Sequence, residues 1–204
     1  MANFSFQFKF SDKFQEAFSP ARKRVIESLV KGFSNKTIAA QYDISVKAVE
    51  QIVAALNKQF VARGKFFNSR LRIIVSLMAN DFLDYESQEE TSIAKNINDN
   101  LLKTLILCSI GLSSFAIARL LEVSEKTVEQ RLSQLYDYFD IDTKNLTAEN
   151  PRVLLFINSL IKGTVDNAHI VNLVQQTKLP RLERIIEDPE YFVTRLANKH
   201  NLVG

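Results

Sequence analysis

The chain has 204 residues, of which 46% are apolar, and its formal net charge is +3 at pH 7. This length suits one or two small domains, and the single cysteine excludes a disulfide framework and favours a reducing compartment. No apolar run approaches the roughly 20 residues of a membrane span, and the N-terminus lacks a signal-peptide layout. We therefore expect a cytoplasmic protein without a membrane partner, with Cys108 in its core.

The charge is divided unevenly along the chain. Residues 1–82 hold 13 Lys and Arg against 6 Asp and Glu, a balance of +7, whereas residues 83–204 hold 13 against 17, a balance of −4. A basic region attracts polyanions such as nucleic acids, although an uneven solvated surface gives the same count. The first half is therefore the candidate for nucleic-acid contact.

Aromatic and polar residues alternate from Asn3 to Phe10. A period of two is typical of a β-strand, and because an isolated strand is not stable, its phenylalanines need a partner. That partner is either a strand of another chain, which would make a dimer, or the protein's own helical core. We assign residues 1–17 to an N-terminal strand or arm.

Residues 18–83 have the pattern of four helices. The residues that start, cap or end the first three are, in order, Ser19 and Pro20, Gly32, Ser34, Asp43 and Ser45. Proline suits the first helical position, glycine ends a helix by adopting a left-handed conformation, and serine caps a helix through its hydroxyl. The fourth helix is expected from about Asn68 to Leu83.

The same pattern returns 79 positions later. Gly32-Phe33-Ser34 reappears as Gly111-Leu112-Ser113, and Val49-Glu50-Gln51 reappears as Val128-Glu129-Gln130. A shared register indicates two copies of one supersecondary unit. The predicted order is an N-terminal arm at 1–17, a first unit at 18–83, an acidic linker at 84–96, a second unit at 97–163 and a helical extension at 164–204. The expected fold is all-α, with two four-helix units in tandem and a short N-terminal strand.

The second and third helices of each unit have the features of a helix-turn-helix. Each copy has a small residue in the second helix, an apolar residue that fills the turn and a valine that anchors the third helix: Ala39, Ile44 and Val49, then Ala118, Val123 and Val128. This anchoring leaves the early positions of the third helix free to enter a major groove of DNA.

The candidate DNA contacts of the first unit lie around its third helix. Gln51 can make two hydrogen bonds to adenine, and Lys47 can reach guanine or a phosphate. Other basic side chains suit flanking phosphates, which position a protein without reading sequence. The full set is Lys36, Thr37, Ser45, Val46, Lys47, Ala48, Gln51, Lys58, Arg63 and Lys65.

Three stretches of the first unit, Ser19-Pro20, Gly32 to Ala39 and Ile44 to Val49, together resemble the LuxR/FixJ-type (GerE-like) DNA-binding domain of bacterial transcription regulators. Glu122 to Glu129 resembles the start of that family's third helix. The resemblance covers about residues 18–83 and 97–163. It implies four-helix domains that bind DNA as dimers, commonly through the fourth helix. By position it implies DNA contacts at Lys36, Lys47 and Gln51, with Lys126 and Gln130 as their counterparts.

This sequence departs from the family pattern in the first helix and in the turn. Arg22 stands where the family usually has an acidic residue, which adds positive charge to the first helix. The turn glycine is replaced by Asp43 and Glu122, of which aspartate tolerates the left-handed conformation better.

The two copies differ where DNA contact is expected. Phe115 stands in place of Lys36, and residues 125–142 hold two basic side chains against five acidic ones, which repel phosphates. We therefore expect the first unit to read DNA and the second to serve dimerisation or protein contact. An exposed Phe115 suits a protein surface, and burial under the tail helices is the alternative. The candidate contacts of the second unit are Phe115, Lys126, Thr127, Gln130 and Arg131.

The sequence therefore predicts a bacterial DNA-binding transcriptional regulator that binds double-stranded DNA as a homodimer or with its own second unit as a pseudo-partner. A protein partner could contact the second unit, the N-terminal strand or the C-terminal tail. Without a glycine-rich phosphate loop or a zinc-spaced Cys/His cluster, we expect no enzyme, cofactor or metal. The alternative is a protein-interaction module whose degenerate helix-turn-helix units dock on a transcription regulator or RNA polymerase. Glu50 and Glu129, on both third helices, favour that alternative.

Overall fold

The structure is a computed structural model that describes residues 8–60, 67–85, 97–144 and 149–165. This part of the chain is mostly helical, with nine helices and one two-stranded antiparallel sheet. No helix in these ranges is long and apolar enough to cross a bilayer. The predicted helical extension at 164–204 lies almost wholly outside the described residues.

The N-terminal strand pairs within its own chain. Strand β1 (Phe8–Phe10) runs antiparallel to β2 (Leu83–Tyr85), with Phe8 opposite Tyr85 and Phe10 opposite Leu83. Strand β2 thus consists of residues that the sequence pattern predicts to belong to the fourth helix and the linker. Residues 1–7, which hold the rest of the predicted strand, lie outside the described residues.

A short helix that the sequence did not predict follows β1. Helix α1 (Asp12–Ala17) is capped by Ser11, whose hydroxyl accepts a hydrogen bond from the Phe14 amide at 3.2 Å. The Phe14 ring is fully buried between Phe10 and Phe18, with ring centroids 4.4 and 5.1 Å away. The Phe18 ring in turn contacts Phe82 at 5.3 Å. These aromatic contacts attach the N-terminal segment to the end of the first unit.

Four helices follow, which we call the first unit: α2 (Pro20–Val30), α3 (Asn35–Tyr42), α4 (Val46–Phe60) and α5 (Ser69–Ala79). The predicted ends are confirmed at Gly32, which has φ of +86°, and at Ser34, whose hydroxyl accepts from the Thr37 amide. The predicted end of the fourth helix at Leu83 is wrong. The left-handed Asp81 follows α5, and Leu83 belongs to β2.

The second unit consists of α6 (Asp99–Ser109), α7 (Ser114–Leu120), α8 (Glu125–Tyr138) and α9 (Pro151–Ile161). Its first three helices begin 79 positions after α2, α3 and α4. Residues 84 and 85 of the predicted linker at 84–96 belong to β2, and residues 86–96 are not described.

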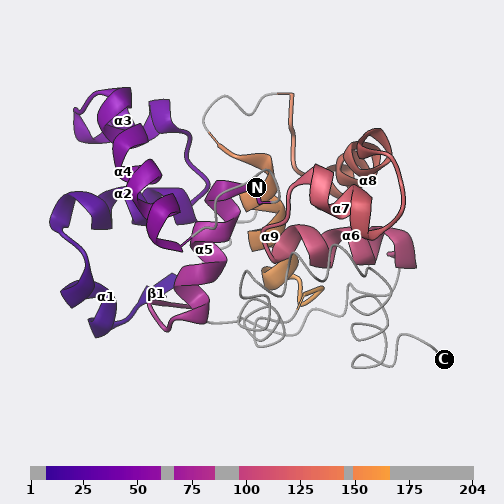
Figure 1. Cartoon of the computed structure of the whole chain (residues 1–204), viewed down its shortest axis with the longest axis horizontal. Helices are drawn as coiled ribbons and strands as arrows, with labels where there is room; N and C mark the ends of the chain where they lie inside the picture. Colours follow the sequence, from indigo (N-terminus) through magenta and orange to yellow (C-terminus); the bar gives the residue numbers. More distant parts are fainter. Residues whose placement is uncertain (1–7, 61–66, 86–96, 145–148, 166–204) are drawn as a thin grey trace.

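One hydrophobic core continues through both units. Helices α5 and α9 pack against each other between the two units, as Figure 1 shows, with α2–α4 on one side and α6–α8 on the other. Every residue of α5 from Leu71 to Met78 is buried, because neighbouring elements cover the helix on all sides. Cys108 is also buried, as predicted.

Candidate nucleic-acid interface

The turn between α3 and α4 is built from backbone and capping contacts. Asp43 adopts the left-handed conformation with φ of +50°, and the Ile44 amide donates to the Ala39 carbonyl at 3.0 Å. The Ser45 hydroxyl accepts from the Ala48 amide at 3.1 Å and so caps α4. Ile44, which the sequence predicts to fill this turn, is 38% exposed.

Helix α4 has a buried face and an exposed face. Val49, Val53 and Leu56 are buried against the core, which confirms the predicted anchor at Val49. Lys47, Gln51 and Lys58 are exposed, and their spacing places them along one side of the helix. The geometry presents cationic and amide groups to solvent from a helix that the core holds firmly.

The remaining candidates of the first unit lie around this face or outside the described residues. Lys36 is exposed near the start of α3, Val46 is 38% exposed, and Ala48 is half-buried. The Thr37 hydroxyl lies 2.8 Å from the Ser34 hydroxyl, so it takes part in the cap of α3. Arg63 and Lys65 lie outside the described residues.

The α7–α8 region repeats this geometry with different side chains. Glu122 is left-handed with φ of +53°, and the Ser124 hydroxyl accepts from the Thr127 amide at 3.0 Å. Lys126 and Gln130 are exposed, whereas Thr127 and Arg131 are half-buried. The ring of Phe115 is half-buried rather than exposed, and the Arg119 guanidinium lies 5.9 Å from its centroid.

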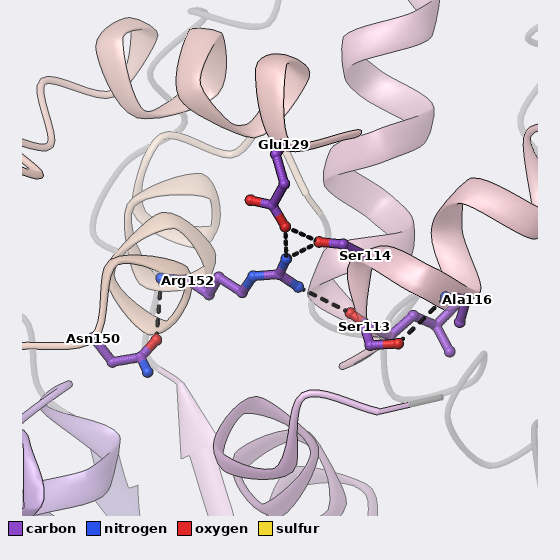
Figure 2. A network of polar contacts seen from close by, with 7 residues as sticks. Ser113, Ser114, Ala116, Glu129, Asn150 and Arg152 are labelled. Carbon is purple, nitrogen blue, oxygen red and sulfur yellow. Dashed lines mark hydrogen bonds and ion pairs between the residues drawn. The ribbon is translucent and has the colours of Figure 1, made fainter. Parts of the chain in front are cut away.

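A cluster around Arg152, at the start of α9, joins three elements of the second unit. As Figure 2 shows, the guanidinium donates to the Ser114 hydroxyl and to the Glu129 carboxylate, at 3.1 Å from Glu129 Oε1. It also donates to the Leu112 carbonyl at 3.3 Å. The Arg152 side chain is 13% exposed and that of Glu129 is 58% exposed. The Glu129 carboxylate is therefore paired with an arginine, although the charge count over residues 125–142 treats it as a free charge that repels DNA.

The first unit has a corresponding cluster around Arg70. Its guanidinium donates to the Phe33 carbonyl at 2.5 Å and to the Asn35 side chain. Phe33 and Asn35 stand 79 positions before Leu112 and Ser114. Burial lowers the pKa of Arg70, and the group remains charged at neutral pH. Both arginines thus tie the start of the fourth helix to the start of the second helix in their own unit.

The sequence carried a signal for these clusters that our reasoning missed. Asn68-Ser69-Arg70 and Asn150-Pro151-Arg152 are matching helix starts, but they lie 82 positions apart instead of 79. The start of the fourth helix follows the start of the third by three more positions in the second unit, so a search at a constant period passes over the match.

The two units also contact each other reciprocally, along a set of contacts that we call the seam. The Asn68 amide donates to the Gly111 carbonyl at 2.9 Å, and the Asn150 amide donates to the Gly32 carbonyl at 2.6 Å. Isolated antiparallel bridges join residue 67 to 112 and residue 33 to 149. In each direction, the start of a fourth helix meets the turn after the other unit's first helix.

Close packing accompanies these hydrogen bonds. A Cβ atom at Gly111 would lie 2.9 Å from Arg72 Cα, and one at Gly32 would lie 3.3 Å from Leu154 Cδ2. Arg72 is buried and donates across the seam to the Ile110 carbonyl at 3.1 Å. Burial lowers the pKa of Arg72 to about 10, which still leaves it charged at neutral pH.

A polar hollow of about 430 Å³ opens beside the seam, and Asn68, Glu129, Tyr136, Asn150 and Arg152 are among the residues that line it. Burial raises the pKa of the Tyr136 hydroxyl, so the group stays protonated at neutral pH. Among the described residues, no group of three or more His, Cys, Asp or Glu side chains is placed to hold a metal ion.

No protein-family model matches this chain, and no curated protein or solved structure matches it either.

Proposed function

We propose that the protein is a cytoplasmic, bacterial DNA-binding transcriptional regulator, built from tandem helix-turn-helix units of the LuxR/FixJ type, in which α4 reads the major groove. The observation that carries this proposal is the exposed side of α4, where Lys47, Gln51 and Lys58 stand on a helix whose other face is buried. A firmly held helix with polar groups at its exposed start is what direct reading of base edges requires.

The charge of the chain supports the same assignment. The first 82 residues carry a balance of +7, and exposed Lys36 lies near the start of α3, the helix that precedes α4. Lysines at this position suit phosphates on either side of the groove, which orient the protein without reading the sequence. Glu50, which is exposed on α4, suits the exocyclic amine of cytosine.

In this proposal the second unit is the internal partner of the first. The family resemblance implies association through fourth helices, and in this chain the two fourth helices, α5 and α9, already pack against each other. Because residues 71–78 of α5 are all buried, a homodimer would need a different surface. The seam therefore favours the pseudo-partner over the homodimer.

The proposal is tested by fluorescence anisotropy with a labelled pool of random DNA duplexes and with sequences selected from it. Affinity should fall steeply with salt, because each neutralised phosphate releases counterions. The double variant Lys47→Ala/Gln51→Ala should lose most of its preference for the selected sequences, since one well-formed base contact contributes about 1–3 kcal/mol of discrimination.

The matched control is Lys126→Ala/Gln130→Ala, which changes the corresponding exposed positions of α8. It should affect sequence preference less than the α4 variant does. Affinity that does not change with salt would refute DNA binding, and a larger effect of the α8 variant would show that we assigned reading to the wrong helix.

One observation favours the alternative function of a protein-interaction module. Ile44 and Val46 flank the cap of α4, and they are the large apolar side chains that are exposed among the described residues. Exposed apolar groups next to each other suit a protein contact. RNA polymerase or a regulator that co-purifies with the protein, but not with Ile44→Ser/Val46→Ser, would support this function if heparin also fails to retain the wild-type protein.

A further inference from the structure

We infer that a single chain presents α4 and α8 to one DNA duplex as two readers in inverted orientation, and that its target is a pair of unequal, inverted half-sites. This inference rests on the proposed function and specifies the DNA that the function requires. It also predicts that one protein chain binds each pair of half-sites.

The reciprocal seam carries the first step. Asn68 bonds Gly111 while Asn150 bonds Gly32, so each unit uses the same two surfaces to contact the other. Reciprocal contact of this kind is the property of a two-fold axis, because a head-to-tail arrangement joins two different surfaces once. The two units are therefore related by an approximate two-fold axis through the seam.

Matching contacts within the units show that the two copies share the local geometry that such an axis requires. Arg70 bonds Phe33 and Asn35, while Arg152 bonds the corresponding Leu112 and Ser114. The two turn glycines have φ values of +86° and +85°. The units thus agree in local geometry at the positions that meet across the axis.

The axis determines the orientation of the two reading helices. A rotation that exchanges the units also exchanges α4 with α8, and it reverses the direction in which each helix would enter the DNA. The two strands of a duplex are related by two-fold axes of the same kind, which is why two-fold proteins bind half-sites in inverted orientation. A direct repeat of half-sites does not match this arrangement.

The seam also restricts the spacing between the half-sites. It is closely packed, with Gly111 against the backbone of Arg72, and two main-chain hydrogen bonds and one from the buried Arg72 guanidinium cross it. A tightly packed interface holds its two sides at one separation. The two half-sites should therefore tolerate little change in their spacing.

The side chains make the two half-sites unequal. Val46 and Lys47 of α4 correspond to Glu125 and Lys126 of α8, so the second helix adds an exposed carboxylate at its start. The Arg152 guanidinium pairs with Glu129 and offsets its charge, whereas Glu125 lies exposed. Asp137 of α8 also stands where α4 has Lys58, so α8 is the weaker of the two readers.

The experiment is selection of binding sequences from random duplexes of about 30 base pairs with the full chain, followed by light scattering of the purified complex. We expect two inverted half-sites, one more strongly specified than the other, and one chain in each complex. Changing Lys126 and Gln130 to Ala should remove the preference at the weaker half-site alone. The corresponding change at Lys47 and Gln51 should remove the preference at the stronger one.

Spacing supplies a second measurement on the selected sequence. Inserting about 5 base pairs, half a helical turn, between the half-sites should lower affinity to that of a duplex with the strong half-site alone. A direct repeat, two chains per duplex, or a spacing change without effect would overturn the inference while leaving DNA binding intact. Failure to enrich any sequence would instead refute the proposed function, so the two failures are distinct.

Discussion

Replacing Gly111 with alanine should destabilise the protein more than replacing Gly163, although both residues have a positive φ. The left-handed conformation costs a residue with a Cβ atom about 1–2 kcal/mol, and this cost is common to both variants. At Gly111 the new Cβ would also lie 2.9 Å from Arg72 Cα and 3.0 Å from Arg72 N, whereas at Gly163 nothing lies within 4 Å. Only the first variant therefore disturbs the seam.

The size of the difference follows from the kind of atom contacted. Arg72 Cα belongs to the buried helix α5, so the backbone has to shift, and overpacking of this kind costs about 1–3 kcal/mol. We expect Gly111→Ala to lose about 2–5 kcal/mol in total and Gly163→Ala about 1–2 kcal/mol. Gly32→Ala should lie between them, because its nearest contact, at 3.3 Å, is the side-chain end of Leu154.

The assay is urea unfolding followed by circular dichroism, which gives the free energy of unfolding for each variant under the same conditions. Thermal unfolding offers a second measurement, in which about 2–4 °C of Tm corresponds to 1 kcal/mol for a chain of this size. Equal losses for Gly111→Ala and Gly163→Ala would refute the seam, and with it the two-fold relation of the units.

Three further results are expected. Arg152→Ala should lose about 1–3 kcal/mol of unfolding free energy in urea, because the buried Leu112 carbonyl loses a donor. Glu129→Ala should lose less than about 1 kcal/mol, because its carboxylate is 58% exposed. Equal losses for the two variants would contradict the cluster. Burial raises the pKa of Cys108 from 9.0 to about 11, so its contribution to stability is complete below pH 9 and is lost as the pH rises towards 11. The free energy of unfolding of Cys108→Ala should therefore fall less steeply over this range than that of the wild type. Rapid alkylation of the native protein at pH 8 would argue against burial. Phe14→Ala should lose about 3–5 kcal/mol of unfolding free energy and should weaken the near-ultraviolet circular dichroism signal, because the ring is fully buried. A smaller loss would show that α1 does not pack on the first unit.

The starts of the second and third helices of both units were predictable from local signals. Ser34, Ser45, Ser113 and Ser124 cap helices through their own hydroxyls, and a turn glycine needs no distant contact to adopt a positive φ. The third helices were equally clear, because apolar residues at helical spacing mark the buried face. These features depend on residues within a few positions of one another.

The N-terminal segment was predicted in part. The alternation of phenylalanines indicated a strand, but its partner β2 lies more than 70 residues away and is three residues long, too short for a recognisable pattern. The first and last residues of β2 continue the apolar spacing of α5, so the sequence pattern predicts a helix that continues past Asp81. The left-handed Asp81 marks the boundary, and the antiparallel pairing makes the strand stable.

The sequence predicted which residues of the candidate site are exposed, and it did not predict which side chains pair with one another. Lys47 and Gln51 are exposed as expected, since their positions follow from the periodicity of α4. The pairing of Glu129 with Arg152 joins residues 23 positions apart across two helices, and charge counting treated that carboxylate as free. Ile44 was assigned to the turn by its apolar character; the turn closes through main-chain hydrogen bonds, and Ile44 is 38% exposed.

The sequence by itself determined the two repeated units, because capping, turn formation and helical periodicity act over short distances and occur in both copies. Only the tertiary structure decided how the copies are related. Their relation depends on main-chain hydrogen bonds from Asn68 to Gly111 and from Asn150 to Gly32, and main-chain groups are the same in every sequence. A repeat period therefore indicates that a unit recurs, whereas its orientation emerges when buried surfaces and backbone groups find partners across the seam.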